Sequence, residues 1–120
     1  MKTILVVDDE YAILDALRAF LEDEGYRVVT ASDGREALVR LRESIPDVIL
    51  LDMMMPFMDG RDALRAIRAE PAWQSIPVVL MSAGLRALAA SAPLGPTAVL
   101  HKPFGVDQLV TLLDEVMARR

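Results

Sequence analysis

The chain of 120 residues is acidic, with 13 lysine and arginine residues against 18 aspartate and glutamate residues and a formal net charge of −5. It is 53% hydrophobic and 26% charged and has no cysteine, a globular composition that excludes disulfides, thiolate metal sites and a thiol nucleophile. The acidic balance argues against direct nucleic-acid binding, and no apolar run reaches the roughly 18 residues of a membrane span. We therefore expect one cytoplasmic domain over 1–120, without a signal peptide.

Short apolar runs alternate with helical patterns along the chain. The expected strands are Ile4–Val7, Arg27–Thr30, Val48–Leu51, Val78–Met81 and Ala98–Leu100. Three of them are continuous apolar runs, which is typical of strands covered on both faces. The expected helices are Glu10–Glu24, from Asp33 toward Pro46, Gly60–Ala69, Leu85–Ala92 and Val106–Met117. The third of these helices carries Arg61, Arg65 and Arg68 on one side, a pattern typical of a solvated face.

Regular alternation of strand and helix predicts an α/β fold. Short strands joined by helices form a parallel sheet with right-handed crossovers, so five strands and five helices fit a single doubly wound sheet with helices on both faces. In such a sheet the ligand site lies beyond the carboxyl ends of the strands, near the reversal of strand order.

Polar residues stand where that rule places a site, at the ends of the expected strands. They are Asp8 and Asp9 after the first strand, Asp52 after the third, Ser82 after the fourth and Lys102 after the fifth. Each aspartate alone is explained as a helix cap. Three carboxylates at one rim are not, because each like-charge pair about 4 Å apart costs on the order of 4 kcal/mol at an effective dielectric constant of ~20. Oxygen ligands favour a hard cation, and we expect Mg²⁺.

A carboxylate beside Mg²⁺, a lysine and a hydroxyl is suited to handling a phosphoryl group. Lys102 and the cation would neutralise the phosphoryl oxygens, and Ser82 would hydrogen-bond to one of them. One aspartate would attack phosphorus, as carboxylates do in aspartyl-phosphate chemistry.

Four motifs occur at these strand ends in chain order. They are Val6-Val7-Asp8-Asp9-Glu10, Leu51-Asp52-Met53-Met54-Met55-Pro56 with Met58-Asp59-Gly60, Met81-Ser82-Ala83, and His101-Lys102-Pro103-Phe104. Together they resemble the receiver domain of two-component response regulators, the CheY-like family, and the resemblance covers the whole chain. It implies a flavodoxin-like sheet of strand order 2-1-3-4-5, one of the common orders of doubly wound sheets.

The resemblance also implies roles for individual residues. Asp52 matches the phosphoacceptor, and Asp9 and Asp52 match direct Mg²⁺ ligands together with the backbone carbonyl of Met54. Asp8 matches the acid that binds the metal largely through water. In the same family, Ser82 matches the hydroxyl that turns toward the phosphoryl group, Lys102 the cation that pairs with it, and Pro103 a residue that usually follows a cis peptide bond.

The function implied is that of a phosphorylation-activated signalling receiver rather than an enzyme, one that at most assists its own phosphorylation and dephosphorylation. A sensor histidine kinase or a histidine phosphotransfer protein would donate the phosphoryl group, and the phosphorylated chain would present a changed protein-binding surface. The target is either a downstream effector protein or a C-terminal output domain beyond Arg120, and the sequence does not choose between them.

Three rival functions are weaker. The first is a haloacid dehalogenase-type phosphatase, a class whose sequences resemble the pattern Asp-x-Asp-x-Thr after the first strand. Here the first strand is followed by Asp8-Asp9-Glu10-Tyr11-Ala12. A nucleotide-binding module needs a glycine-rich turn at that place, and the first glycine is Gly25. The third rival is a pseudo-receiver that binds partners without phosphorylation, and the complete set of acceptor residues argues against it.

The chain departs from the family pattern before its lysine. Receivers usually carry Tyr or Phe three residues earlier, where this sequence has Val99, whose stiff β-branched side chain has no ring to bury. The Ala83–Thr97 segment is also about two residues shorter than in a typical receiver and leaves only Leu85–Ala92 for a helix. Either this segment reorders on phosphorylation or it packs in a fixed way of its own, and the two are weighed equally.

Overall fold

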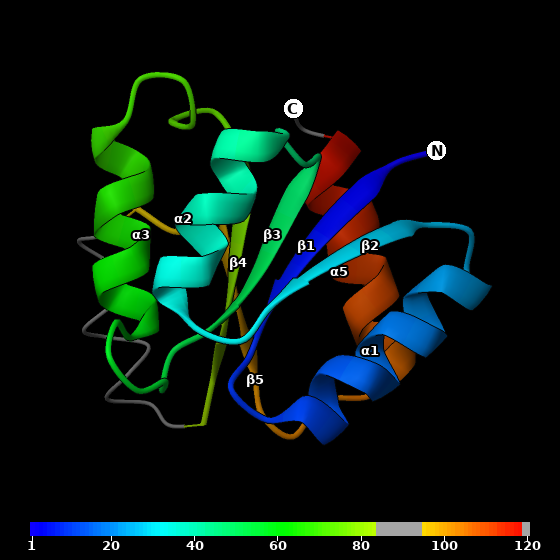
Figure 1. The fold of residues 1–120 in the computed structure, drawn as a ribbon. Helices are drawn as coiled ribbons and strands as arrows, with labels where there is room; N and C mark the ends of the chain where they lie inside the picture. Colours follow the sequence, from blue (N-terminus) through cyan, green and yellow to red (C-terminus); the bar gives the residue numbers. More distant parts are fainter. Residues whose placement is uncertain (84–94, 119–120) are drawn as a thin grey trace.

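The computed structural model describes residues 1–83 and 95–118 (Figure 1). Its strands are β1 (Thr3–Val7), β2 (Arg27–Ala31), β3 (Val48–Asp52), β4 (Val78–Ser82) and β5 (Ala98–His101). Its helices are α1 (Tyr11–Asp23), α2 (Gly34–Glu43), α3 (Gly60–Ala69) and α5 (Val106–Ala118). The expected helix Leu85–Ala92, and with it most of the segment proposed to reorder, lies outside the described residues. Among the described helices none is long and apolar enough to cross a membrane.

The five strands form one parallel sheet in the order β2-β1-β3-β4-β5. This confirms the predicted doubly wound, flavodoxin-like topology, with every strand in its expected place. β3 and β4 are buried along their whole length, as their continuous apolar sequences predict. The carboxyl ends of the strands all lie at the bottom of Figure 1.

Two hydrophobic clusters cover the two faces of the sheet. α1 and α5 pack on one face through residues such as Leu14, Leu21 and Leu113, and α2 and α3 pack on the other through Leu41 and Ile67. Figure 1 shows the two helix pairs on opposite sides of the strands. The sheet core thus holds the strand ends rigidly in register at the lower edge.

The ends of the helices follow local sequence signals. Asp33 caps α2 by accepting a hydrogen bond from the Glu36 N–H at 2.8 Å, and Asp59 caps α3 by accepting one from the Asp62 N–H at 3.0 Å. Gly25 follows α1 with φ +97°, a conformation that favours glycine and ends the helix. These caps start α2 and α3 at the lower edge of the sheet.

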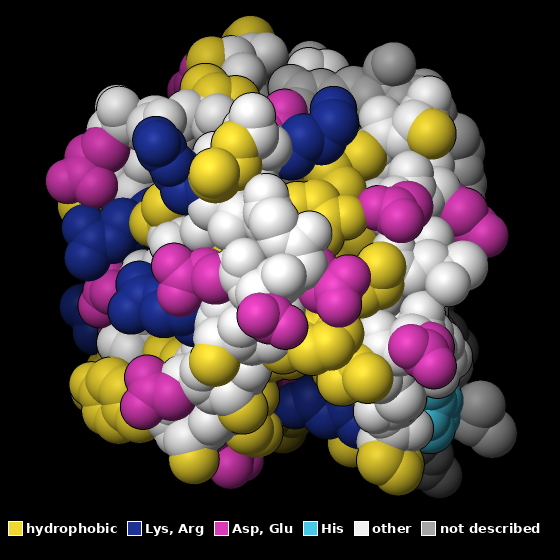
Figure 2. All heavy atoms as spheres, turned by 90° about the vertical axis from the view of Figure 1, so that its right-hand side faces the viewer, with side chains coloured by type: hydrophobic (Ala, Val, Ile, Leu, Met, Phe, Trp, Pro, Cys, Tyr) yellow, Lys and Arg dark blue, Asp and Glu magenta, His cyan; other side chains and the backbone are white. Residues whose placement is uncertain are grey.

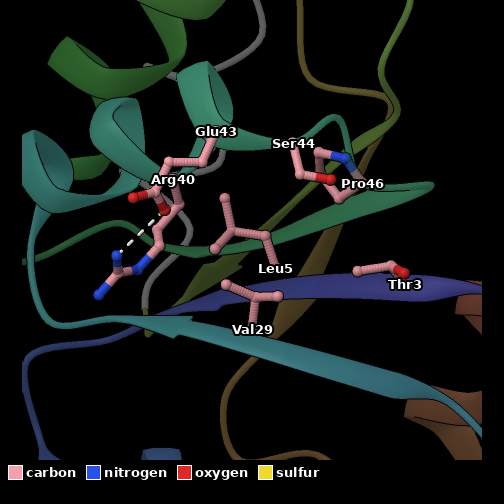
Figure 3. A pocket seen from close by; sticks show the side chains of 7 residues that line it. All are labelled: Thr3, Leu5, Val29, Arg40, Glu43, Ser44 and Pro46. Atoms are coloured by element: carbon pink, nitrogen blue, oxygen red, sulfur yellow. Dashed lines mark hydrogen bonds and ion pairs between the residues drawn. The ribbon is translucent and has the colours of Figure 1, made fainter.

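A small cavity lies at the opposite edge, between the end of α2 and the sheet (Figure 3). It has a volume of about 90 Å³ and is lined by Thr3, Leu5, Val29, Arg40, Glu43, Ser44 and Pro46. The ion pair between Arg40 and Glu43, 3.2 Å long, lies at its side. Cofactor sites usually occupy roughly 300–1,000 Å³, so this cavity is a packing defect rather than a cofactor site.

The side chain of Arg68 corrects the expectation of a wholly solvated basic face on α3. Its guanidinium donates hydrogen bonds to the backbone carbonyls of Gly95 at 2.9 Å, Gln74 at 3.1 Å and Ile76 at 2.9 Å. Burial lowers the pKa of Arg68. Arg65 does follow the expectation, since it is exposed and pairs with Asp62 at 3.2 Å. Arg68 therefore fastens the end of α3 to the segments that lead into β4 and β5.

We expect Arg68→Met to lower the free energy of unfolding by about 2 kcal/mol, because it removes charged donors from three carbonyls at once. Arg65→Met is the matched control on the same helix and should change it by less than about 0.5 kcal/mol, as an exposed ion pair contributes little. Urea denaturation of both variants measures the difference. Equal losses for the two would contradict the fastening role.

Candidate functional site

An acidic cluster stands at the carboxyl edge of the sheet. One carboxylate oxygen from each of Asp8, Asp9 and Asp52 lies within 4.8 Å of the others. Asp8 follows β1 directly, and Asp52 is the last residue of β3, which pairs with β1 in register Val7↔Leu51. Asp8 and Asp52 are buried, at 0% and 5% exposure, whereas Asp9 faces solvent. Adjacent parallel strands thus bring residues 43 or 44 positions apart to one point.

Lys102 joins this cluster from the end of β5. Its Nζ donates a hydrogen bond to Asp52 Oδ1 at 3.0 Å and lies 3.7 Å from Asp8 Oδ2. The backbone N–H of Lys102 donates to the carbonyl of Ser82 at 2.7 Å, and Ser82 is 1% exposed at the end of β4. The peptide bond between Lys102 and Pro103 is cis, as the resemblance implied. The structure therefore brings together every strand-end residue that the sequence singled out.

The charges of the cluster affect one another. Burial raises the pKa of Asp52, and the charge of Asp8 raises it further, against the hydrogen bonds from Lys102 and the Met54 backbone, which lower it. Burial by itself lowers the pKa of Lys102, but the hydrogen bond to Asp52 and the charges of Asp52, Asp8 and Glu10 outweigh it and raise the pKa overall. The lysine is thus held as a cation beside carboxylates whose charge the fold only partly compensates.

The net charge of the site matches, with opposite sign, that of a divalent cation. Three carboxylates and one ammonium sum to −3 + 1 = −2. Asp8 Oδ1 accepts a hydrogen bond from the Glu10 N–H at 3.0 Å, while Asp8 Oδ2 is buried and accepts none within the described part of the chain. A buried carboxylate oxygen in this state is stabilised by a cation close to it. The donor set, all oxygen, fits a hard ion such as Mg²⁺.

The loop after Asp52 is packed against the end of β3. Gly60 donates its N–H to the carbonyl of Met53 at 2.9 Å, and a Cβ on Gly60 would clash with the Asp52 carbonyl and lie 2.7 Å from the Met53 Cα. On the other side the Gly34 N–H donates to the Met58 carbonyl at 3.3 Å. In the sequence Gly60 is only one position of a motif, and the close approach of two backbones explains why it is glycine.

An apolar hollow borders the site on the α1 side. It has a volume of about 620 Å³ and is lined by Ile13, Leu17, Met81, Ala83, Lys102, Pro103 and Phe104. On this side of the molecule, Figure 2 shows hydrophobic side chains mixed with acidic and basic ones. The site thus opens beside a surface with apolar contact area.

Comparison with known proteins identifies the class to which this fold and site belong. The sequence model of the response regulator receiver domain matches residues 4–114. The solved structure of the chemotaxis response regulator CheY4 of Vibrio cholerae superimposes with a TM-score of 0.90 at 33% identity, over 97% of this chain and 98% of that one. A response regulator receiver domain protein from Clostridium thermocellum gives a TM-score of 0.91 at 31% identity, over 99% and 96% of the two chains.

The chain belongs to the response regulator receiver domain family. Among curated proteins, the transcriptional regulatory protein KdpE of Mycobacterium tuberculosis is 39% identical over 125 residues, which is 99% of this chain and 52% of the relative. The chain spans about half the length of the curated relatives it matches. Membership of this family supports a role in phosphorylation-type signalling, and the relatives are named as regulators.

Gly60→Ala should lower the free energy of unfolding by about 2 kcal/mol, because the added methyl group forces the Asp52 backbone and α3 apart. Gly105→Ala is the matched control, since a Cβ there meets nothing within 4 Å. Because Gly105 precedes α5 as its N-cap, we expect a loss of at most about 1 kcal/mol there. Thermal and urea unfolding of both variants provide the measurement. A Gly60→Ala protein as stable as wild type would show that the loop can shift to accommodate the methyl group, which would contradict the tight packing inferred here.

Proposed function

We propose that this chain is a receiver that accepts a phosphoryl group on Asp52 from a phosphohistidine and changes its protein-binding surface in response. The observation that carries the proposal is the contact of Lys102 with Asp52 inside a cluster that also holds Asp8 and Asp9. The chain belongs to the receiver family, and these residues stand at the positions to which the family resemblance assigns the acceptor, the lysine and the metal-binding acids.

The proposed transfer is a nucleophilic substitution at phosphorus. An oxygen of the ionised Asp52 carboxylate forms the new O–P bond while the N–P bond of the donor's phosphohistidine breaks, and the electron pair of that bond stays on the imidazole nitrogen. The Lys102 ammonium, 3.0 Å from Asp52 Oδ1, neutralises charge that the phosphoryl oxygens bring. Ser82, buried at the end of the neighbouring strand, supplies a hydroxyl for one of those oxygens.

A divalent metal, Mg²⁺, would be held by Asp9, Asp52 and the backbone carbonyl of Met54, with Asp8 acting through water. Bound there, it supplies positive charge that offsets the repulsion between the carboxylates and the incoming phosphoryl group. Asp9 is exposed and so can ligate an ion from solvent, while the buried Asp8 remains close beneath it. The uncompensated charge of −2 and the buried Asp8 Oδ2, which accepts no hydrogen bond from the described residues, support this assignment.

The pseudo-receiver remains the alternative function. It would keep the fold and a binding surface without phosphorylation. The three acids lie within 4.8 Å of one another, Lys102 is hydrogen-bonded to Asp52, and Ser82 ends the neighbouring strand, which supports the phosphorylated receiver over it. A sensor histidine kinase or a histidine phosphotransfer protein is the proposed donor. The proposed target is an effector protein or an output domain outside these residues, as the longer relative KdpE is named a transcriptional regulatory protein.

Incubation with Mg²⁺ and acetyl phosphate should add one phosphoryl mass to the wild-type chain and none to Asp52→Asn, because the neutral amide of that variant replaces the nucleophilic carboxylate. Asp62→Asn, which changes an exposed acid on α3 outside the cluster, is the control and should label like wild type. Intact-protein mass spectrometry is the measurement. Phosphoryl that persists in Asp52→Asn, or a wild-type chain that never labels, would reject the assignment.

Asp9→Ala should weaken Mg²⁺ binding by at least about tenfold, since even outer partners of a metal ligand are typically worth that much. Asp8→Ala should weaken it less, because Asp8 acts through water. Asp15→Ala removes an exposed acid of α1 and controls for net charge. Isothermal titration calorimetry measures all four proteins, and equal affinity for wild type and Asp9→Ala would refute the ligand assignment.

A further inference from the structure

An exposed aromatic ring stands in the loop that follows the acceptor. Phe57 is 80% exposed, and its backbone has φ +66°, the left-handed region that non-glycine residues rarely adopt. Holding a phenylalanine in this backbone conformation disfavours the folded state. The ring of Phe57 packs against neither hydrophobic cluster, whereas the neighbouring Met55 and Met58 pack against the cluster under α2 and α3. The guanidinium carbon of Arg35 lies 4.8 Å from the centroid of the ring. Packing in the core therefore does not explain why a phenylalanine stands at this position.

The loop holds the ring outward by its backbone. The Met58 N–H donates to the Pro56 carbonyl at 2.8 Å, which closes a tight turn around Phe57, and the Gly34 N–H donates to the Met58 carbonyl at 3.3 Å. At its ends the loop is tied by the Gly60 N–H to the Met53 carbonyl. The ring therefore presents a preformed apolar surface that needs no rearrangement to be contacted.

The ring lies close to the acceptor. Phe57 is three residues before Gly60, so its backbone is within about 11 Å of the Gly60 backbone, which itself contacts that of Asp52. A standard protein interface buries roughly 800 Å² on each partner, a disc of about 16 Å radius. A partner centred over Asp52 with such an interface reaches Phe57. Met54, 72% exposed, lies between them in the sequence.

We propose that Phe57, backed by Arg35 and flanked by Met54, is a contact and specificity residue for the protein that donates the phosphoryl group. This inference rests on the proposed function. Asp52 is only 5% exposed, so a histidine carried by a folded donor can bring its phosphorus to the carboxylate only when the donor's surface lies against this rim. Phenylalanine, methionine and arginine are enriched in interface cores. The partner therefore carries an apolar patch beside its phosphohistidine.

The test compares a protein donor with a small one. Phe57→Gly removes the ring and suits the positive φ, so the variant is expected to fold. The donors are acetyl phosphate and the autophosphorylated cytoplasmic portions of sensor histidine kinases from the same genome, using the one that labels wild type fastest. We expect Phe57→Gly to raise the KM for that kinase about fivefold or more, with kcat and the rate from acetyl phosphate unchanged.

Two further variants make the result specific. Phe57→Tyr keeps a ring and should restore a KM near wild type. Ile45→Ala removes an apolar side chain that is 47% exposed at the opposite edge of the sheet and should leave both donors unaffected. An unchanged KM in Phe57→Gly, equal slowing with acetyl phosphate, or no kinase that labels wild type would each overturn the inference. Failure of acetyl phosphate to label wild type at Asp52 would instead reject the proposed function.

Discussion

Repulsion among three carboxylates at the end of a buried sheet is the constraint on which the rest of the site depends. The buried Asp8 and Asp52, with oxygens at most 4.8 Å apart, repel each other by roughly 3.5 kcal/mol at an effective dielectric constant of ~20, and solvent weakens the repulsion from the exposed Asp9. The fold compensates one charge with Lys102, which reaches Asp52 and Asp8 from β5. The remaining negative charge attracts cations. The acids cannot move apart to relieve their repulsion, because the strands that carry them are rigidly packed.

Rigidity of the strand ends comes from burial on both faces. β3 and β4 are wholly buried between the two helix layers, so Asp52 and Ser82 cannot move far without disturbing the core. The loop around Gly60 adds a second restraint, since backbone lies directly on backbone there. In the proposed function, a phosphoryl group on Asp52 would therefore meet groups already in position, and any adjustment would fall on the less buried surroundings.

The surface around the site divides into two parts with different chemistry. On the α1 side a hollow lined by residues such as Ile13 and Phe104 offers concave apolar area. On the α2 and α3 side the Phe57 ring projects outward with Arg35 beside it. A donor protein placed over the acids would contact a recess on one side and a projection on the other. This asymmetry is a physical basis on which a receiver could discriminate among donors of similar fold.

Local signals in the sequence were sufficient for most of the fold. Continuous apolar runs marked the buried strands, Asp33 marked the start of α2, and alternation of strand and helix predicted the parallel sheet, because these depend on periodicity and on capping chemistry within a few residues. The strand order and the cis bond before Pro103 came from the family resemblance, and both are present in the structure. The gathering of the strand-end acids followed from the topology rule.

What the tertiary structure alone decided are the contacts between segments distant in sequence. Arg68 looked like part of a solvated basic stripe, and only the folded chain shows its guanidinium bound to three carbonyls. Gly60 needs to be glycine because the Asp52 backbone lies against it, and the outward ring of Phe57 depends on hydrogen bonds that fix its positive φ. Helical or strand periodicity carries no information about such approaches, since they arise where two packed elements meet in space.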